Sequence, residues 1–205
     1  QGWIPTTDDD VTDAPVKGNQ EGIFGYGENG GYTAVTNLVS NAGVVGTDVT
    51  GVGTARRYVA ACEYGGDKGI FGFGQTGSNV SMSNLVSNAG VVATDTTGVG
   101  SARKGLGACG YGGDKGIFGY GWTSSAVSIT NLVSNAGVVA TDTTGVGTAR
   151  QYIGATEYGE DKGIFGFGTV SGFENLTNLV SNAGVVATDT TGVGTARWGL
   201  EGCGY

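Results

Sequence analysis

Histidine is absent from the 205 residues of this chain. Its absence excludes serine and cysteine nucleophiles activated by an imidazole, histidine general bases, and zinc or copper sites with histidine ligands. Positive charge is also scarce, because 10 lysines and arginines stand against 18 aspartates and glutamates. The net charge of −8 and the lack of a basic cluster argue against nucleic acid and anionic membrane surfaces as partners.

Long apolar runs and paired cysteines are missing as well. No apolar run approaches the roughly 18–20 residues that cross a bilayer, so the sequence predicts no membrane insertion. Cys62, Cys109 and Cys203 occupy the same position in three repeats of the sequence, and Thr156 fills that position in the fourth. Their odd number and their separation argue against disulfides, and we expect small buried side chains.

Glycine is the abundant residue, with 43 copies against two prolines. Hydrophobic residues make up 39% of the chain and charged residues 14%, which is typical of a folded protein. The glycines follow no three-residue period and lie among many Val, Ile, Thr, Phe and Tyr residues. This composition predicts an all-β protein of short strands joined by tight turns.

A 47-residue repeat organises the chain. Nearly identical segments begin at Asn37, Asn84, Asn131 and Asn178. Each repeat contains four runs with strand character, which in one copy are residues 58–64, 69–74, 80–86 and 91–97, with glycine-rich turns between them. The pattern predicts a four-stranded antiparallel sheet per repeat, and its length is typical of a β-propeller blade.

The positions of the repeat boundaries predict how the propeller closes. Complete blades would be 54–100, 101–147 and 148–194, and residues 195–205 would join residues 21–53 in a fourth blade. We therefore expect a four-bladed β-propeller whose ring is closed by a C-terminal strand that pairs with the N-terminal blade. Such closure removes exposed sheet edges.

Two alternations run through the repeats. The first strand carries tyrosine and glutamate in two repeats and glycine at both positions in the other two: Tyr58 and Glu63, Tyr152 and Glu157, against Gly105 and Gly110, Gly199 and Gly204. The second strand carries Phe73 and Phe167 in the first pair, and Tyr120 and Tyr26 in the second. We interpret the larger ring as filling room, or finding a hydroxyl partner, where the neighbouring strand has glycine.

The motif order resembles a known family. An arginine turn, an apolar strand, the segment YGGDKGIFGFG at residues 64–74, a variable polar loop and a Val/Leu run resemble the kelch-type β-propeller repeat over residues 21–205. The tryptophan that kelch repeats carry late in each blade is missing. Near-identical repeats also resemble amplified propellers of phage and metagenomic structural or tail-fibre-like proteins. The resemblance implies recognition and assembly rather than catalysis.

Residues 1–20 lie outside the repeats and differ from them in composition. They hold both prolines and the acidic run Asp8, Asp9 and Asp10, with Trp3 and Ile4 as apolar anchors. We interpret them as an acidic arm that lies on its own domain or on a neighbouring subunit. Because the chain starts with Gln1 and not with methionine, we expect either a removed signal or pro-segment or a fragment of a longer protein.

Sequence variation predicts a binding face. In a four-stranded antiparallel blade, the turns after strands two and four share one face, and these turns carry most of the differences between repeats. Exposed aromatic rings beside polar groups are typical of surfaces that bind sugars or proteins. The alternative is drift in exposed loops, with the aromatic rings packed between blades. The candidate residues are Trp122, Trp198, Tyr32, Tyr58, Tyr152, Phe173, Arg57, Lys104, Gln151 and Gln75.

The repeated charges predict structural roles. An aspartate precedes the repeat arginine by eight residues in every copy, as Asp95 precedes Arg103, and could pair with an arginine within or between blades. A fourfold carboxylate ring for Ca²⁺ is the alternative, but DTTG lacks the oxygen spacing of a calcium loop, so we expect no metal and no cofactor.

The most consistent hypothesis is a non-enzymatic recognition or structural module in an extracellular or virion assembly. It would present the variable face to a receptor or glycan and contact neighbouring subunits through the arm. A free secreted lectin is the alternative. A glycosidase-like enzyme that uses Glu63 and Glu157 across the channel ranks third, because two carboxylates alone are weak support.

Overall fold

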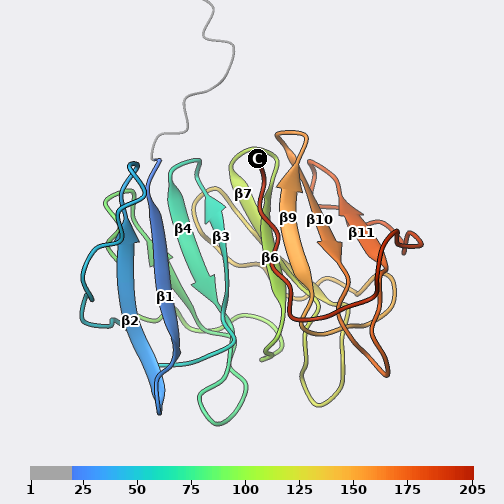
Figure 1. Cartoon of the computed structure of the whole chain (residues 1–205), viewed down its shortest axis with the longest axis horizontal. Coiled ribbons are helices and arrows are strands. Elements are labelled where there is room, and N and C mark those ends of the chain that lie inside the picture. Colours follow the sequence, from blue (N-terminus) through green and yellow to red (C-terminus); the bar gives the residue numbers. More distant parts are fainter. Residues whose placement is uncertain (1–19) are drawn as a thin grey trace, which may run out of the picture.

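The computed structural model describes residues 20–205, and this part of the chain forms strands and turns without a helix (Figure 1). The prediction of an all-β fold is confirmed. Among these residues, no helix is long and apolar enough to cross a membrane. The predicted arm, including Trp3, Ile4 and Asp8–Asp10, lies outside the described residues.

The strands form four small antiparallel sheets. The first sheet has the order β1-β2, and the second, third and fourth have the orders β3-β4-β5, β6-β7-β8 and β9-β10-β11. The strand bounds in residues 20–205 are β1 Gly22–Glu28, β2 Tyr32–Val39, β3 Ala60–Tyr64, β4 Lys68–Gly72, β5 Ser83–Val86, β6 Gly107–Tyr111, β7 Lys115–Gly119, β8 Thr130–Val133, β9 Gly154–Tyr158, β10 Lys162–Gly166 and β11 Thr177–Val180.

The prediction of four-stranded blades is wrong. The run at residues 91–97 makes only two isolated bridges to β5, at Val92 and Thr96. Side chains replace the missing ladder, because the Asn84 amide donates hydrogen bonds to the Ala93 carbonyl at 3.0 Å and to the Asp95 carboxylate at 2.9 Å. Each complete sheet therefore has three strands and an irregular outer segment.

Left-handed backbone shortens the predicted strands. Tyr58 has φ 55° and Phe73 has φ 61°, and β3 and β4 lie between these two residues. A bulky residue in this conformation costs about 1–2 kcal/mol, so the surrounding packing must hold it there. Arg103 supplies part of that packing, with its guanidinium carbon 4.2 Å from the centre of the Phe73 ring.

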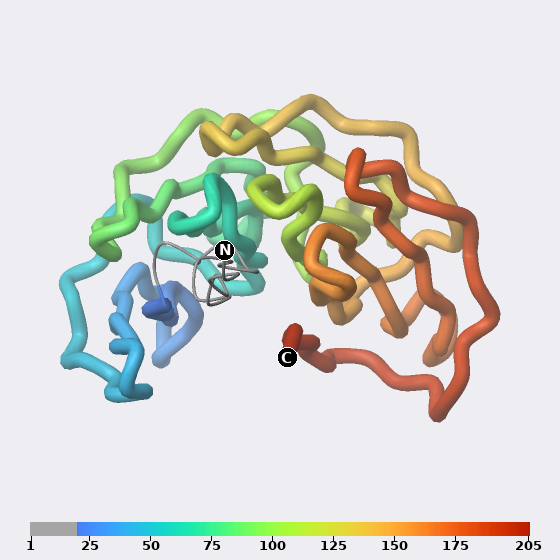
Figure 2. The backbone as a smooth tube through the Cα atoms, turned by 90° about the horizontal axis from the view of Figure 1, so that it is seen from above, coloured from blue at the N-terminus to red at the C-terminus, as the bar shows by residue number. Residues whose placement is uncertain are grey.

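The hydrophobic core lies between neighbouring sheets, which follow one another along an arc (Figure 2). The Phe118 ring packs directly on Gly72 of the preceding sheet, where a β-carbon would lie 2.6 Å from the ring. Phe71 packs in the same way on Gly25, and Phe165 packs on Gly119. Glycine at these positions lets each sheet approach the next closely.

A buried arginine joins each sheet to the next. Arg103, with a fully buried side chain, donates to the Tyr120 carbonyl at 2.8 Å and to the Asn131 amide oxygen at 2.7 Å. Its Nη1 lies 3.9 Å from the Asp142 carboxylate. Burial lowers the pKa of Arg103 to about 10, and Asp142 opposes that shift, so the group stays charged at neutral pH.

The aspartate partner of each buried arginine follows it in the chain and is not the aspartate eight residues before it. Arg150 and Asp189, for example, are 39 residues apart in the chain. The same aspartate also binds the backbone and hydroxyl of the residue two positions before the arginine, as Asp142 does with Ser101 at 3.0 and 2.7 Å. Of the two predicted arrangements, the structure has the pairing within a blade, because Arg103 and Asp142 both lie in the predicted blade 101–147 and Arg150 and Asp189 both lie in 148–194.

The C-terminal residues lie along β9, and the ends of the arc are not joined (Figure 2). The Gly199 amide donates to the Tyr152 carbonyl at 3.0 Å, and a β-carbon at Gly202 would lie 2.9 Å from the Ala155 carbonyl oxygen. In residues 20–205, β1 pairs only with β2. The expected pairing of a C-terminal strand with the first sheet is therefore not formed here.

The cysteine prediction is only partly confirmed. All three thiols are free, and Cys109 is buried, which raises its pKa to about 12. Cys62 is half-buried, whereas Cys203 is exposed. Exposure of Cys203 follows from its place in the unpaired C-terminal segment.

Arg103→Met should lower the free energy of unfolding by about 3 kcal/mol, because the Tyr120 carbonyl and the Asn131 amide lose a buried charged donor. Urea unfolding measures the change. Arg57→Met is the matched control, since Arg57 is partly exposed and its ion pair is screened by water, and it should cost much less. Equal costs for the two variants would contradict a structural role for the buried arginine.

Candidate functional site

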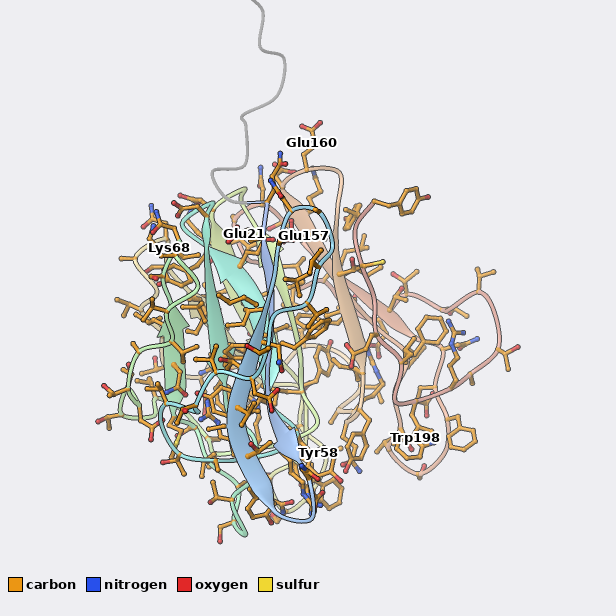
Figure 3. The ribbon with its side chains drawn as sticks, turned by 60° about the vertical axis from the view of Figure 1, so that its left-hand side comes forward. Glu21, Tyr58, Lys68, Glu157, Glu160 and Trp198 are labelled. Carbon is orange, nitrogen blue, oxygen red and sulfur yellow. The ribbon has the colours of Figure 1, made fainter. Side chains whose placement is uncertain are left out.

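The variable turns meet on one end of the molecule, as predicted. Backbone bridges join Arg57 to Gln75, Lys104 to Trp122 and Gln151 to Thr169. Figure 3 places Tyr58 and Trp198 at this end, and Lys68, Glu157 and Glu160 at the other. Two kinds of variable position thus lie side by side in three successive sheets.

Four aromatic side chains, Tyr32, Tyr58, Tyr152 and Trp198, form what we call the aromatic cluster together with Arg57 and Lys104. The Tyr58 and Tyr152 rings are 5.9 Å apart at 69°, and the Tyr152 and Trp198 rings are 5.2 Å apart at 52°. Burial, followed by the neighbouring Tyr58, raises the pKa of Tyr152. Tyr58 and Tyr152 lie just before β3 and β9, Trp198 lies just before the C-terminal residues that run along β9, and Tyr32 begins β2.

Two cations lie among the rings. The Arg57 guanidinium is 4.8 Å from the centre of the Tyr58 ring and 5.5 Å from that of Tyr32. The Lys104 ammonium lies 5.6 Å from the centre of the Tyr58 ring. Cation–π contacts at exposed positions are individually weak, because water competes for the cation. Together, the contacts hold the cations and rings in one surface patch.

Glu28 is a member of this patch that sequence reasoning missed. Its carboxylate accepts a hydrogen bond from Arg57 at 2.5 Å, and this bond raises the pKa of Arg57. The side-chain amide oxygen of Gln75, Oε1, accepts two further bonds from Arg57, both at 3.2 Å. Glu28 occupies the repeat position of Gln75, so the 47-residue spacing contained the signal.

The alternation of tyrosine and glycine has a steric cause. A β-carbon at Gly105 would lie 3.0 Å from the Tyr152 ring, so a ring at position 105 would collide with Tyr152. At the other end, a β-carbon at Gly110 would overlap the Glu157 carboxylate. The glycines therefore leave room for large side chains from neighbouring sheets.

The second alternation depends on a hydrogen bond. The Tyr120 hydroxyl donates to the Val146 carbonyl at 3.1 Å, and the Tyr26 hydroxyl donates to the Val52 carbonyl at the same distance. Of the two interpretations, that the tyrosine fills room or that its hydroxyl finds a partner, the structure has the hydroxyl partner. That partner belongs to the outer turn and not to the glycine-bearing strand.

Other predicted site residues lie apart from the aromatic cluster. The Trp122 carbonyl accepts a hydrogen bond from Asn79, and its side chain is half-buried. Phe173 is exposed in the turn after β10, next to its bridge with Thr169. Within residues 20–205, neither ring forms a ring pair with the rings of the cluster, although the Trp122 backbone is bridged to Lys104. Gln151 is placed beside Thr169 by its backbone.

A cavity of about 400 Å³ lies at the centre of the arc. Its lining comes from all four sheets and includes Phe24, Ala60, Leu106 and Ile153, with Glu201 from the C-terminal segment. Apart from Glu201, these side chains are apolar. In the described part of the chain, no three Cys, Asp or Glu residues are placed to hold a metal ion.

No protein-family model and no curated protein matches this chain. The geometry of the aromatic cluster and the internal repeats are therefore the guides to function. The rings offer exposed apolar faces, and the neighbouring cations and carboxylate offer charge. This combination can bind a ligand without chemical conversion.

Gly105→Ala should destabilise the protein by about 2–4 kcal/mol, because alanine is strained at φ 61° and its methyl group crowds the Tyr152 ring. Gly199→Ala is the matched control. Gly199 has φ 67° with open space around it, so its cost of about 1–2 kcal/mol isolates the backbone strain. Equal losses in chemical unfolding would show that the ring does not crowd this position.

Proposed function

We propose that this chain is a non-enzymatic recognition module that binds its ligand at the aromatic cluster. One observation carries the proposal. Aromatic rings from separate repeats gather at one end of the molecule: Tyr32, Tyr58, Tyr152 and Trp198. The turns that differ little between repeats, such as GGDK at residues 65–68, lie at the opposite end (Figure 3). Variation is therefore concentrated where the exposed rings gather.

The chemistry of the cluster fits a glycan or the surface of a receptor protein. Trp198 is 50% exposed and Tyr58 is 42% exposed, so both rings keep a face open to solvent. Such rings stack on the apolar faces of sugars and of protein side chains at a low cost in entropy. Glu28, Gln75 and Lys104 beside them offer acceptors and donors that orient a polar ligand.

The proposed architecture is a closed four-bladed propeller, similar to kelch-type repeats. Three observations support it: four equivalent sheets, an arc with facing ends, and a central cavity lined by all four sheets together with Glu201. Repeated modules of this kind suit an extracellular or virion assembly, similar to phage tail-fibre-like proteins. A free secreted lectin is the second candidate, and the exposed Trp198 favours it equally.

Trp198→Ala should weaken glycan or receptor binding at least tenfold, about 1.4 kcal/mol, because the most exposed ring of the cluster is lost. A glycan array followed by titration calorimetry measures the loss. Trp122→Ala is the matched control and should bind normally, since the Trp122 ring is half-buried and forms no ring pair with the rings of the cluster. Undiminished binding by a folded Trp198→Ala variant would refute this site.

Removal of residues 1–20 should convert a multimeric assembly into monomers, because this acidic segment is the proposed contact with neighbouring subunits. Light scattering on the full chain and on the shortened chain measures the masses. A monomeric full chain that binds sugar would favour the secreted lectin. Multimers that persist without residues 1–20 would remove the arm from the proposal.

A further inference from the structure

The first sheet lacks the strand that every other sheet has on its inner edge. By the 47-residue spacing, β1 and β2 correspond to β4 and β5, so nothing in residues 20–205 stands in the place of β3. Three repeats after Ala60–Tyr64, the sequence reaches residues 201–205, EGCGY. The strands β3 and β6 read AACEY and GACGY, so the cysteine and the tyrosine recur in this segment.

A tyrosine closes each complete interface between sheets. Tyr64 is buried against Gly137 of the next sheet, where a β-carbon would lie 3.0 Å from its ring and 2.8 Å from Leu85. Tyr111 packs on Gly184 beside Leu132 with the same distances. The tyrosine and leucine together fill the outer part of the interface.

The first interface has the leucine without the tyrosine. Leu38 packs on Gly90, and beside them lies a cavity of about 240 Å³ whose lining includes Ile70, Val86 and Gly90. Tyr205, the repeat counterpart of Tyr64, is fully exposed. The structure thus has an empty place for a tyrosine and an exposed tyrosine that carries the matching repeat position.

Other contacts stop at the same junction. The Phe24 side chain is 64% exposed. Its repeat counterpart Phe71 packs on Gly25 and is only 4% exposed. At Gly166, which should receive the Phe24 ring, a β-carbon would meet only Thr177, at 3.3 Å. Leu179 is exposed, and no atom lies within 4 Å of a β-carbon at Gly43, its repeat partner. Both halves of each missing contact are therefore present on the two ends of the arc.

We propose that residues 201–205 dock on the free edge of β1 as the third strand of the first sheet, with the Tyr205 side chain in the 240 Å³ cavity. The register follows β3 on β4, in which Ala60 faces Gly72, Cys62 faces Ile70 and Tyr64 faces Lys68. The residues of β1 precede those of β4 by one repeat, and residues 201–205 follow β3 by three repeats. The same register therefore places Glu201 opposite Gly25, Cys203 opposite Ile23 and Tyr205 opposite Glu21. This inference rests on the closed-ring part of the proposed function.

The occupant is the chain's own segment for two reasons. Glu201 already lines the central cavity together with Ile23 and Phe24, so the tethered segment begins one cavity width from β1. Tethering gives it a high effective concentration relative to a second copy. In sequence, the only other candidate is residues 13–17, where Pro15 and Lys17 stand in place of the cysteine and the tyrosine. Proline cannot donate a ladder hydrogen bond.

Docking has a consequence for the aromatic cluster. Arg57, Lys104 and Gln151 bridge to Gln75, Trp122 and Thr169, and the same series places its fourth member, Trp198, opposite Glu28. Trp198 would then stand beside the carboxylate that binds Arg57. The closed ring therefore completes the ligand-binding face.

Cysteine cross-linking tests the register. In the Ile23→Cys variant, a mild oxidant such as diamide should form a disulfide between the introduced cysteine and Cys203 within one molecule: two S–H bonds break, one S–S bond forms, and the oxidant takes up two electrons and two protons. Peptide mapping identifies the linkage. Phe24→Cys is the matched control, because its side chain points to the opposite face of β1, and its cross-linking should be at least about tenfold slower. Adding Cys203→Ser to Ile23→Cys should abolish the product.

Three outcomes would overturn the inference: no cross-link in the Ile23→Cys variant, equal rates for the two variants, or covalent dimers alone, which would make a second copy the occupant. Hydrogen exchange on the unaltered chain gives a measurement that no substitution can disturb. The β1 amides should exchange as slowly as those of β4. Removal of residues 201–205 should make the β1 amides exchange faster, because they lose the hydrogen bonds to the docked strand. Cross-linking without glycan binding would refute the proposed function alone, and binding without cross-linking would refute the docking alone.

Discussion

The buried arginine between consecutive sheets is the interaction on which this architecture depends. Arg56, Arg103 and Arg150 are fully buried, and each donates to a carbonyl and an asparagine amide of the following sheet. A guanidinium with fixed planar donors tolerates little change in the position of its acceptors. Each arginine therefore fixes the angle between two sheets, and three such angles produce the arc.

Glycine sets the distance between the sheets, and together with the arginines it creates the candidate site. Because Gly72 and Gly119 lack side chains, the Phe118 and Phe165 rings lie directly on the preceding strand. This close approach brings the segments before the innermost strands to the axis, where Tyr58 and Tyr152 come into contact. The aromatic cluster is thus a product of core packing, and only its residue types are free to vary with the ligand.

The 47-residue period predicted the number of sheets, their antiparallel strands and the end on which variation gathers. It did not predict the loss of the outer strand, because the Asn84 side chain captures the Ala93 carbonyl that a ladder would use. It left open which aspartate meets each arginine, since identical repeats offer equivalent partners within and between units. Nor did it separate Trp122 from Trp198, because a shared face does not fix the distance of a residue from the axis.

The junction between the first and fourth sheets determines whether all residues of the aromatic cluster lie together on one binding face. Exposed Phe24, Leu179 and Tyr205 leave apolar surface in water, and burial of each large side chain contributes roughly 1.5–3 kcal/mol. The interfaces that are already complete bury the equivalent side chains, so the same contacts favour closure of the fourth. Tyr32 belongs to the first repeat and Trp198 to the last, so the binding face spans this junction. Ligand affinity and ring closure should consequently be coupled, because a ligand that contacts both residues binds the closed form more tightly.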